Sequence, residues 1–408
     1  MVKNYIFSIL FIATSLQSVS YADSFKRKKK VSKPRLLHKV LKKKAAKKLI
    51  QNEESDEVLD SPLNPNLLKS KYTSWGIDPS NNNSSINLTK AWQKFKNNKQ
   101  VVVAVIDTGI DPKHPHLDKN VHVTLGDVSF RNYGIDFSKN RYNKKQPSDS
   151  HGHGTHVAGI VKSVYPEVKI LTLKYYNPKA TGQDNLNSTI SALKYAGDQN
   201  VDVINYSGGG PEPALEELRV LKLAEKKGIL VVAAAGNEES DIDVKNNAYY
   251  PASYGLKNII TVTAHDQGLK MLNSSNYGKR TVDLSAPGYR IKSSLPNGRS
   301  GYLTGTSQAT AFVTGAAALL LAQFPELTAT QLKAIINKSA RKEITLLSRC
   351  KSGGRLDATR AQNLAREFSK RVKAQNRGVA NRVPNSINKK LKNNKKVGKI
   401  TYRKSQAN

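Results

Sequence analysis

The chain has 408 residues and a formal net charge of +35, and this length is enough to bury one large α/β core. Its only cysteine is Cys350, which excludes a fold held together by internal disulfides. Export without disulfides is more typical of a bacterial envelope or culture medium than of animal secretion.

The first 22 residues have the pattern of a secretory signal peptide. Lys3 supplies the positive start, residues 5–16 the apolar centre, and Ser20-Tyr21-Ala22 a cleavage site with small residues at its two ends. The apolar run is shorter than the roughly twenty residues that a membrane span needs, which argues against an anchor. We expect cleavage after Ala22, no transmembrane segment afterwards, and a bacterial protein that is secreted, periplasmic or attached to the cell envelope.

Two segments carry most of the positive charge. Residues 24–50 contain thirteen Lys or Arg and no acid, and residues 361–408 contain fourteen basic residues and one Glu. Such blocks are usually solvated arms, although they could also contact anionic polymers such as nucleic acid, acidic cell wall or lipid head groups. We assign residues 23–65 to a basic arm and linker that forms a short pro-region, and residues 359–408 to a basic C-terminal tail.

The segment between these arms alternates short apolar runs with helical patterns. We expect buried strands at 101–106, 168–173, 201–205, 229–235 and 259–264, and helices at 153–163, 188–199, 214–227, 306–323 and 328–338. This alternation predicts an α/β fold of three layers, with a mostly parallel sheet between two layers of helices, over residues 66–358.

Three short motifs carry the chemistry. In VVVAVIDTGID at 101–111, a buried-strand pattern ends in a carboxylate, Asp107. HGHGTHVAG at 151–159 runs from a glycine-rich turn into a helix, and GTSQAT at 305–310 places Ser307 at the start of a long apolar helix. Alone, Asp107 could cap a turn, Ser307 could cap its helix, and the histidines at 151, 153 and 156 could bind zinc. In the order Asp, His, Ser they are the parts that activate a hydroxyl as a nucleophile.

These motifs resemble the subtilisin-like serine proteases (subtilases, peptidase family S8). The resemblance extends from about residue 72 to residue 358 and includes VDVINYSGGG at 201–210, VVAAAGNE at 231–238, VDLSAPG at 282–288, FPELTATQLKAIINKSA at 324–340 and GGRLDA at 353–358.

The resemblance implies a role for each residue of the site. Asp107 orients His153, the general base, and Ser307 attacks a peptide carbonyl to form an acyl-enzyme. Asn237 and the Ser307 amide form the oxyanion hole. The strand edge Ser207, Gly208 and Gly209 binds the substrate; Gly208 stands where many relatives have leucine, which implies wider adjoining subsites.

The interpretation as a subtilisin-like protease needs no cofactor and no metal. It predicts a monomeric, secreted serine endopeptidase that acts on polypeptides. The alternative is a catalytically silent protein that binds polyanions or surfaces on a protease scaffold. The two basic arms favour that alternative, whereas the intact chemical positions oppose it.

Overall fold

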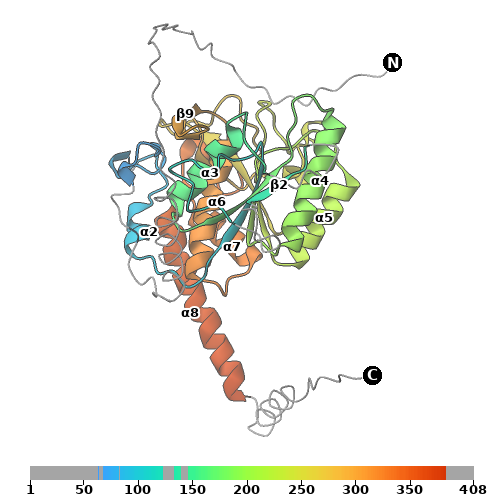
Figure 1. Cartoon of the computed structure of the whole chain (residues 1–408). Coiled ribbons are helices and arrows are strands. Elements are labelled where there is room, and N and C mark those ends of the chain that lie inside the picture. The colour runs from blue at the N-terminus through green and yellow to red at the C-terminus, as the bar shows by residue number, and fades with distance from the viewer. Residues whose placement is uncertain (1–62, 64–67, 82, 123–132, 139–145, 383–408) are drawn as a thin grey trace, which may run out of the picture. The chain divides into compact units, whose positions relative to one another are not determined.

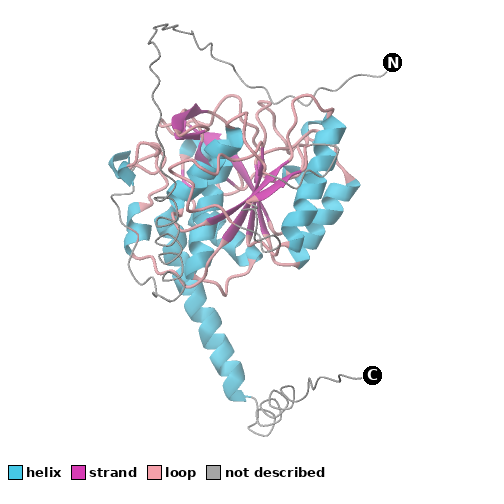
Figure 2. Ribbon diagram, viewed as in Figure 1, coloured by secondary structure: helices cyan, strands magenta, loops and turns pink. Residues whose placement is uncertain are grey.

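The computed structural model describes residues 63, 68–81, 83–122, 133–138 and 146–382. The expected signal peptide, nearly all of the basic arm and linker, and the second half of the C-terminal tail lie outside these ranges. Within them a nine-stranded sheet has the order β10–β11–β7–β6–β5–β4–β1–β3–β2 (Figures 1 and 2). All neighbouring strands are parallel except the pair β10 and β11.

The strands of this sheet are short, and two further strands form a separate antiparallel pair, β8–β9. Their bounds are β1 Val102–Asp107, β2 Gly134–Asp136, β3 Lys169–Lys174, β4 Val203–Tyr206, β5 Leu230–Ala234, β6 Ile259–His265, β7 Leu284–Pro287, β8 Ile291–Leu295, β9 Arg299–Leu303, β10 Arg341–Lys342 and β11 Gly354–Arg355.

Helices cover both faces of the sheet, as Figure 1 shows. On one face lie α2 Thr89–Gln93, α3 His153–Val164, α6 Thr306–Gln323, α7 Ala329–Ser339 and α8 Ala358–Arg382, and on the other α4 Gly182–Asp198 and α5 Leu215–Lys226. Short 3-10 helices occur at Pro79–Asn81, Lys245–Asn247, Ala252–Tyr254 and Ile344–Leu346. The predicted three-layer α/β fold is therefore confirmed.

Strand β1 shows why the central strands read as continuous apolar runs. Val103 and Val105 join the core on the α6 side, whereas Ala104 and Ile106 join the core on the α4 and α5 side. Side chains alternate between the two faces of a strand, and helices cover both faces here, so every position of the strand favours an apolar residue.

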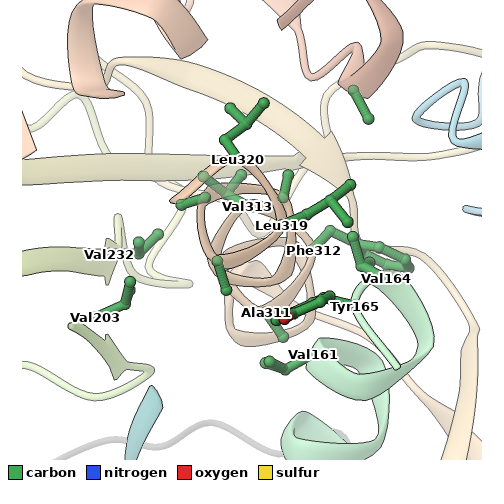
Figure 3. Packing of buried hydrophobic residues seen from close by; sticks show 14 of the residues in the cluster. Val161, Val164, Tyr165, Val203, Val232, Ala311, Phe312, Val313, Leu319 and Leu320 are labelled. Carbon is green, nitrogen blue, oxygen red and sulfur yellow. The ribbon is translucent and has the colours of Figure 1, made fainter. Parts of the chain in front are cut away.

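Helix α6 passes through the core, and all 18 of its residues are buried. Figure 3 shows Ala311 and Phe312 of α6 beside Val161 and Val164 of α3. The two helices approach closely at Gly315, where an added Cβ would lie 2.6 Å from the Val164 Cβ and 2.9 Å from the Val161 carbonyl oxygen. Since α3 begins at His153 and α6 at Thr306, this contact fixes the relative position of two candidate catalytic segments.

Helix α8 continues the packed part of the structure beyond residue 358, where we expected the catalytic domain to end. Ala361, Gln362 and Ala365 are buried, and the Gln362 side chain donates hydrogen bonds to the Ala91 carbonyl and the Gln323 side chain. Residues four apart lie on one helix face, so a buried stripe coexists with the exposed Lys370. None of the described helices has the length and hydropathy of a membrane span.

We expect Gly315→Ala to lower the free energy of unfolding by about 1–3 kcal/mol, because the methyl group would press on a β-branched side chain and a carbonyl that cannot turn away. Gly197→Ala on α4 is the matched control. Its Cβ would meet only the tip of Lys227 at 3.9 Å, so the better helix propensity of alanine should stabilise it by up to about 1 kcal/mol. Urea denaturation measures both variants. Equal stability of the two would contradict the tight helix contact.

Candidate active site

The ends of two neighbouring strands bring the candidate residues to one edge of the sheet. Strands β1 and β4 are parallel, and Ile106 pairs with Tyr206. The next residues along the two strands are Asp107 and Ser207, which therefore leave the carboxyl edge of the sheet side by side. In open α/β folds this edge is where ligands bind.

Asp107 and His153 form a hydrogen-bonded pair in which the carboxylate is buried and the ring is partly exposed. Asp107 is 3% exposed, and its Oδ1 lies 2.7 Å from the His153 Nδ1 and accepts a second hydrogen bond from the Thr108 backbone N–H at 2.7 Å. A carboxylate accepts only, so in the neutral ring Nδ1 carries the hydrogen and Nε2 is the basic nitrogen. The pair thus sets the tautomer that a general base needs.

Burial opposes the charged form of the His153 ring. The Asp107 carboxylate favours that form through its charge and its hydrogen bond, and the balance raises the pKa of His153 above the ordinary 6.5. An imidazolium formed during a reaction at this site is therefore stabilised.

Glycine lets helix α3 start directly against β1. An added Cβ at Gly154 would lie 2.2 Å from the Gly109 carbonyl oxygen and 3.2 Å from the Asp107 Cβ. Gly152, just before the helix, has a φ of 100°, a conformation that other residues rarely adopt. The glycine-rich motif therefore brings His153 within reach of Asp107.

Asp149 is a positioning residue that the sequence analysis missed. It is buried, and its carboxylate accepts hydrogen bonds from the Thr108 hydroxyl, the backbone N–H groups of His151, Gly152 and Thr155, and the Thr155 hydroxyl. Burial alone would raise the pKa of Asp149, but these donors lower it. An acid just ahead of a glycine-rich helix start was the available signal, since such residues often bind the free N–H groups there.

Ser307 lies in the first turn of α6, beside the residue that follows strand β4. Its side-chain hydroxyl donates to the Ser207 carbonyl at 3.1 Å, and the Ser207 hydroxyl donates to the Ser307 carbonyl at 3.4 Å. The structure therefore joins Asp107 to His153 and Ser307 to Ser207, and the adjacent ends of β1 and β4 hold the two pairs together.

Asn237 is oriented by the start of the same helix. Its side-chain oxygen accepts from the Thr306 backbone N–H at 3.0 Å and from the Thr306 hydroxyl at 3.2 Å. The oxygen is engaged by the residue that precedes Ser307, so the NH₂ group is the end of the amide that is left to act as a donor. A fixed amide donor beside a serine is what the predicted oxyanion hole requires.

The three histidines of the 151–159 motif do not converge as ligands. The His153 Nδ1 faces Asp107, whereas the His156 Nε2 lies 3.0 Å from the Ile291 carbonyl oxygen, and burial lowers the pKa of His156 to about 3. His156 thereby links α3 to β8. Across the described ranges of the chain, no cluster of three or more His, Cys, Asp or Glu side chains could hold a metal ion.

The space beside Gly208 is filled rather than open. An added Cβ at Gly208 would lie 2.7 Å from the Tyr175 hydroxyl oxygen and 3.2 Å from the Tyr206 ring. The expectation of wider subsites therefore does not hold at this position, because Tyr175, which follows β3, occupies the volume that a side chain would take. Sequence reasoning missed this residue.

We expect Asp107→Asn to move the pKa of His153 from above 6.5 to below it, because the charge is lost and burial remains. A raised folded-state pKa stabilises the protein below pH 6.5, and this contribution disappears as the pH rises through that pKa. NMR titration of the ring protons measures the change. The exposed Asp118→Asn is the control and should leave the titration unaltered; a His153 pKa that stays above 6.5 in Asp107→Asn would contradict the assignment.

Comparison with known proteins agrees with this geometry. A family model described as the subtilase family matches residues 98–379, more than half of the chain. The major intracellular serine protease of Bacillus subtilis (strain 168) is 36% identical over 245 residues, 58% of this chain and 72% of that protein. The thermophilic serine proteinase of Bacillus sp. (strain AK1) is 33% identical over 311 residues, 74% of this chain and 70% of that protein.

A third relative, subtilisin DY of Bacillus licheniformis, is 34% identical over 249 residues, 59% of this chain and 83% of that protein. The family-model match over residues 98–379 includes every strand of the sheet, helices α3 to α7 and every candidate site residue. The chain belongs to the subtilase family and is a serine-type endopeptidase.

Proposed function

We propose that Ser307 is the nucleophile of this endopeptidase, His153 its general base and Asp107 the residue that orients His153. The Ser307 hydroxyl loses its proton to the His153 Nε2 as its oxygen attacks a peptide carbonyl, and His153 then returns that proton to the leaving amine. Water hydrolyses the resulting acyl-enzyme by the same route in reverse. The observation that carries the proposal is the 2.7 Å contact between the buried Asp107 carboxylate and the His153 ring.

The Ser307 hydroxyl starts from a different hydrogen bond. It donates to the Ser207 carbonyl, so the hydroxyl hydrogen has to turn away from that carbonyl by rotation before its transfer to His153. A peptide that pairs with the strand edge Ser207–Gly209 competes for this carbonyl and promotes the rotation.

The negative charge that develops on the attacked carbonyl oxygen needs donors that are already in place. The Ser307 backbone N–H, at the N-terminus of α6, and the Asn237 amide group supply them. Thr306 holds the Asn237 oxygen, so the amide need not reorganise during the reaction. Removal of one such donor raises the activation free energy by about 2.7–4 kcal/mol in such enzymes.

The alternative of a silent surface-binding protein is not favoured. It offers no reason for a buried carboxylate–imidazole pair, an oriented amide and a serine at the start of a buried helix to lie at one sheet edge. Each of these groups carries a desolvation cost that a binding scaffold does not require.

A fluorophosphonate probe should label the wild-type chain covalently and should fail to label Ser307→Ala, because only an activated serine attacks the phosphorus. Ser188→Ala on the exposed face of α4 is the matched control and should label like the wild type. Intact mass and peptide mapping locate the label. A folded wild-type chain that takes no label would support the silent scaffold instead.

We further propose that residues 1–22 direct export and are removed, which is supported by the charged start, apolar centre and small-residue end of this segment. Expressed at full length in a bacterium, the protein should leave the cytoplasm with Asp23 as its new N-terminus. Cell fractionation and N-terminal sequencing measure this. A cytoplasmic product that retains residues 1–22 would contradict export and would leave the catalytic assignment unaffected.

A further inference from the structure

Two glycines beyond neighbouring strands define a slot next to the nucleophile. Strands β4 and β5 are parallel, and Tyr206 pairs with Ala233. Three residues further along each chain lie Gly209 and Gly236, so the segments that follow the two strands run side by side. Gly209 belongs to the substrate-binding edge, and Gly236 immediately precedes Asn237.

The ring of Tyr249 fills the space between these glycines. An added Cβ at Gly209 would lie 2.4 Å from the Tyr249 Cε1, and an added Cβ at Gly236 would lie 3.1 Å from the Tyr249 Cδ2. Opposite edges of one ring thus contact the two segments. Both glycines have positive φ angles, 158° and 103°, so neither position accepts a larger residue without strain.

Backbone hydrogen bonds hold Tyr249 in this place. The next residue, Tyr250, accepts from the Gly210 N–H at 3.0 Å and donates to the Gly210 carbonyl at 2.8 Å. The Tyr249 N–H donates to the Ser253 hydroxyl at 3.1 Å, and the ring packs on the small cluster that includes Ala235 and Ala252. The hydrogen bonds of Tyr250 and Ser253 therefore hold the Tyr249 ring against the Ser207–Gly209 edge.

Under the proposed function, a substrate side chain is directed toward this space. A carbonyl attacked by Ser307 has its oxygen toward the Asn237 amide, while its peptide runs along Ser207–Gly209. The side chain of the residue that carries this carbonyl, the acyl residue, then points between the Gly209 segment and the Gly236 segment. Tyr249 occupies the floor or wall of that space.

We propose that Tyr249 is a specificity-determining residue that restricts this protease to polypeptides with a small acyl residue, such as glycine, alanine or serine. This inference rests on the proposed function, since it assumes that Ser307 and Asn237 act on the carbonyl as described. Exclusion of several carbon atoms from a filled pocket is worth one to two orders of magnitude in kcat/KM.

Chromogenic tetrapeptide anilides that differ only in the acyl residue test the proposal. For the wild type, kcat/KM with alanine should exceed that with phenylalanine at least tenfold. Tyr249→Ala should reduce or reverse this ratio by a factor of ten or more, because the slot opens. Tyr249→Phe retains the ring and should keep the wild-type ratio, which separates the effect of volume from that of the hydroxyl group.

Fluorophosphonate labelling of every variant distinguishes a failure of the specificity role of Tyr249 from a failure of the catalytic role of Ser307. A wild-type chain that labels at Ser307 but cleaves the phenylalanine substrate as well as the alanine substrate would overturn the role of Tyr249 and leave the proposed function standing. A labelled Tyr249→Ala with an unchanged ratio would do the same. Absence of both labelling and hydrolysis in the wild type would instead overturn the proposed function. If Tyr249→Ala fails to fold, the wild-type ratio still decides.

Discussion

The hydrogen bond between Asp107 and His153 is the interaction on which the rest of the site depends. Asp107 is 3% exposed, and burial of its carboxylate costs free energy of folding unless hydrogen-bond donors contact its oxygens. Here the Thr108 N–H and the His153 ring supply them, while the Thr108 hydroxyl donates to Asp149, which in turn binds the start of α3. The same contacts that compensate for the buried charge therefore aim the imidazole.

Ser307, the proposed nucleophile, is held in another way, by a helix that is buried along its whole length. Helix α6 packs between the sheet and α3, so Ser307 and the Thr306 N–H that orients Asn237 move only if the core moves. The proposed catalytic groups come from strand ends and helix starts rather than from long loops. This arrangement suits a reaction that depends on preorganised donors.

Much of this architecture could be predicted from sequence, and the reasons are physical. Burial on both faces makes β1 and β5 continuous apolar runs, and α6 shows the even apolarity of a core helix. Asp107, His153 and Ser307 stand out because each interrupts or borders such a run. By contrast, helix α8 was not predicted, because its many basic residues obscure the short apolar face that contains the buried Ala361 and Ala365. The roles of Tyr175 and Tyr249 could not be predicted either. A glycine in the sequence shows that a side chain is absent, but it does not show which distant residue occupies the space.

The most direct test of the central claim is a crystal structure of the protein after reaction with a peptidyl phosphonate. We expect phosphorus bonded to the Ser307 side-chain oxygen, with a phosphoryl oxygen within hydrogen-bond distance of both the Asn237 amide and the Ser307 N–H. The His153 ring should remain on Asp107. A phosphonate attached to another side chain, or a Ser307 adduct whose phosphoryl oxygen turns away from Asn237, would contradict it.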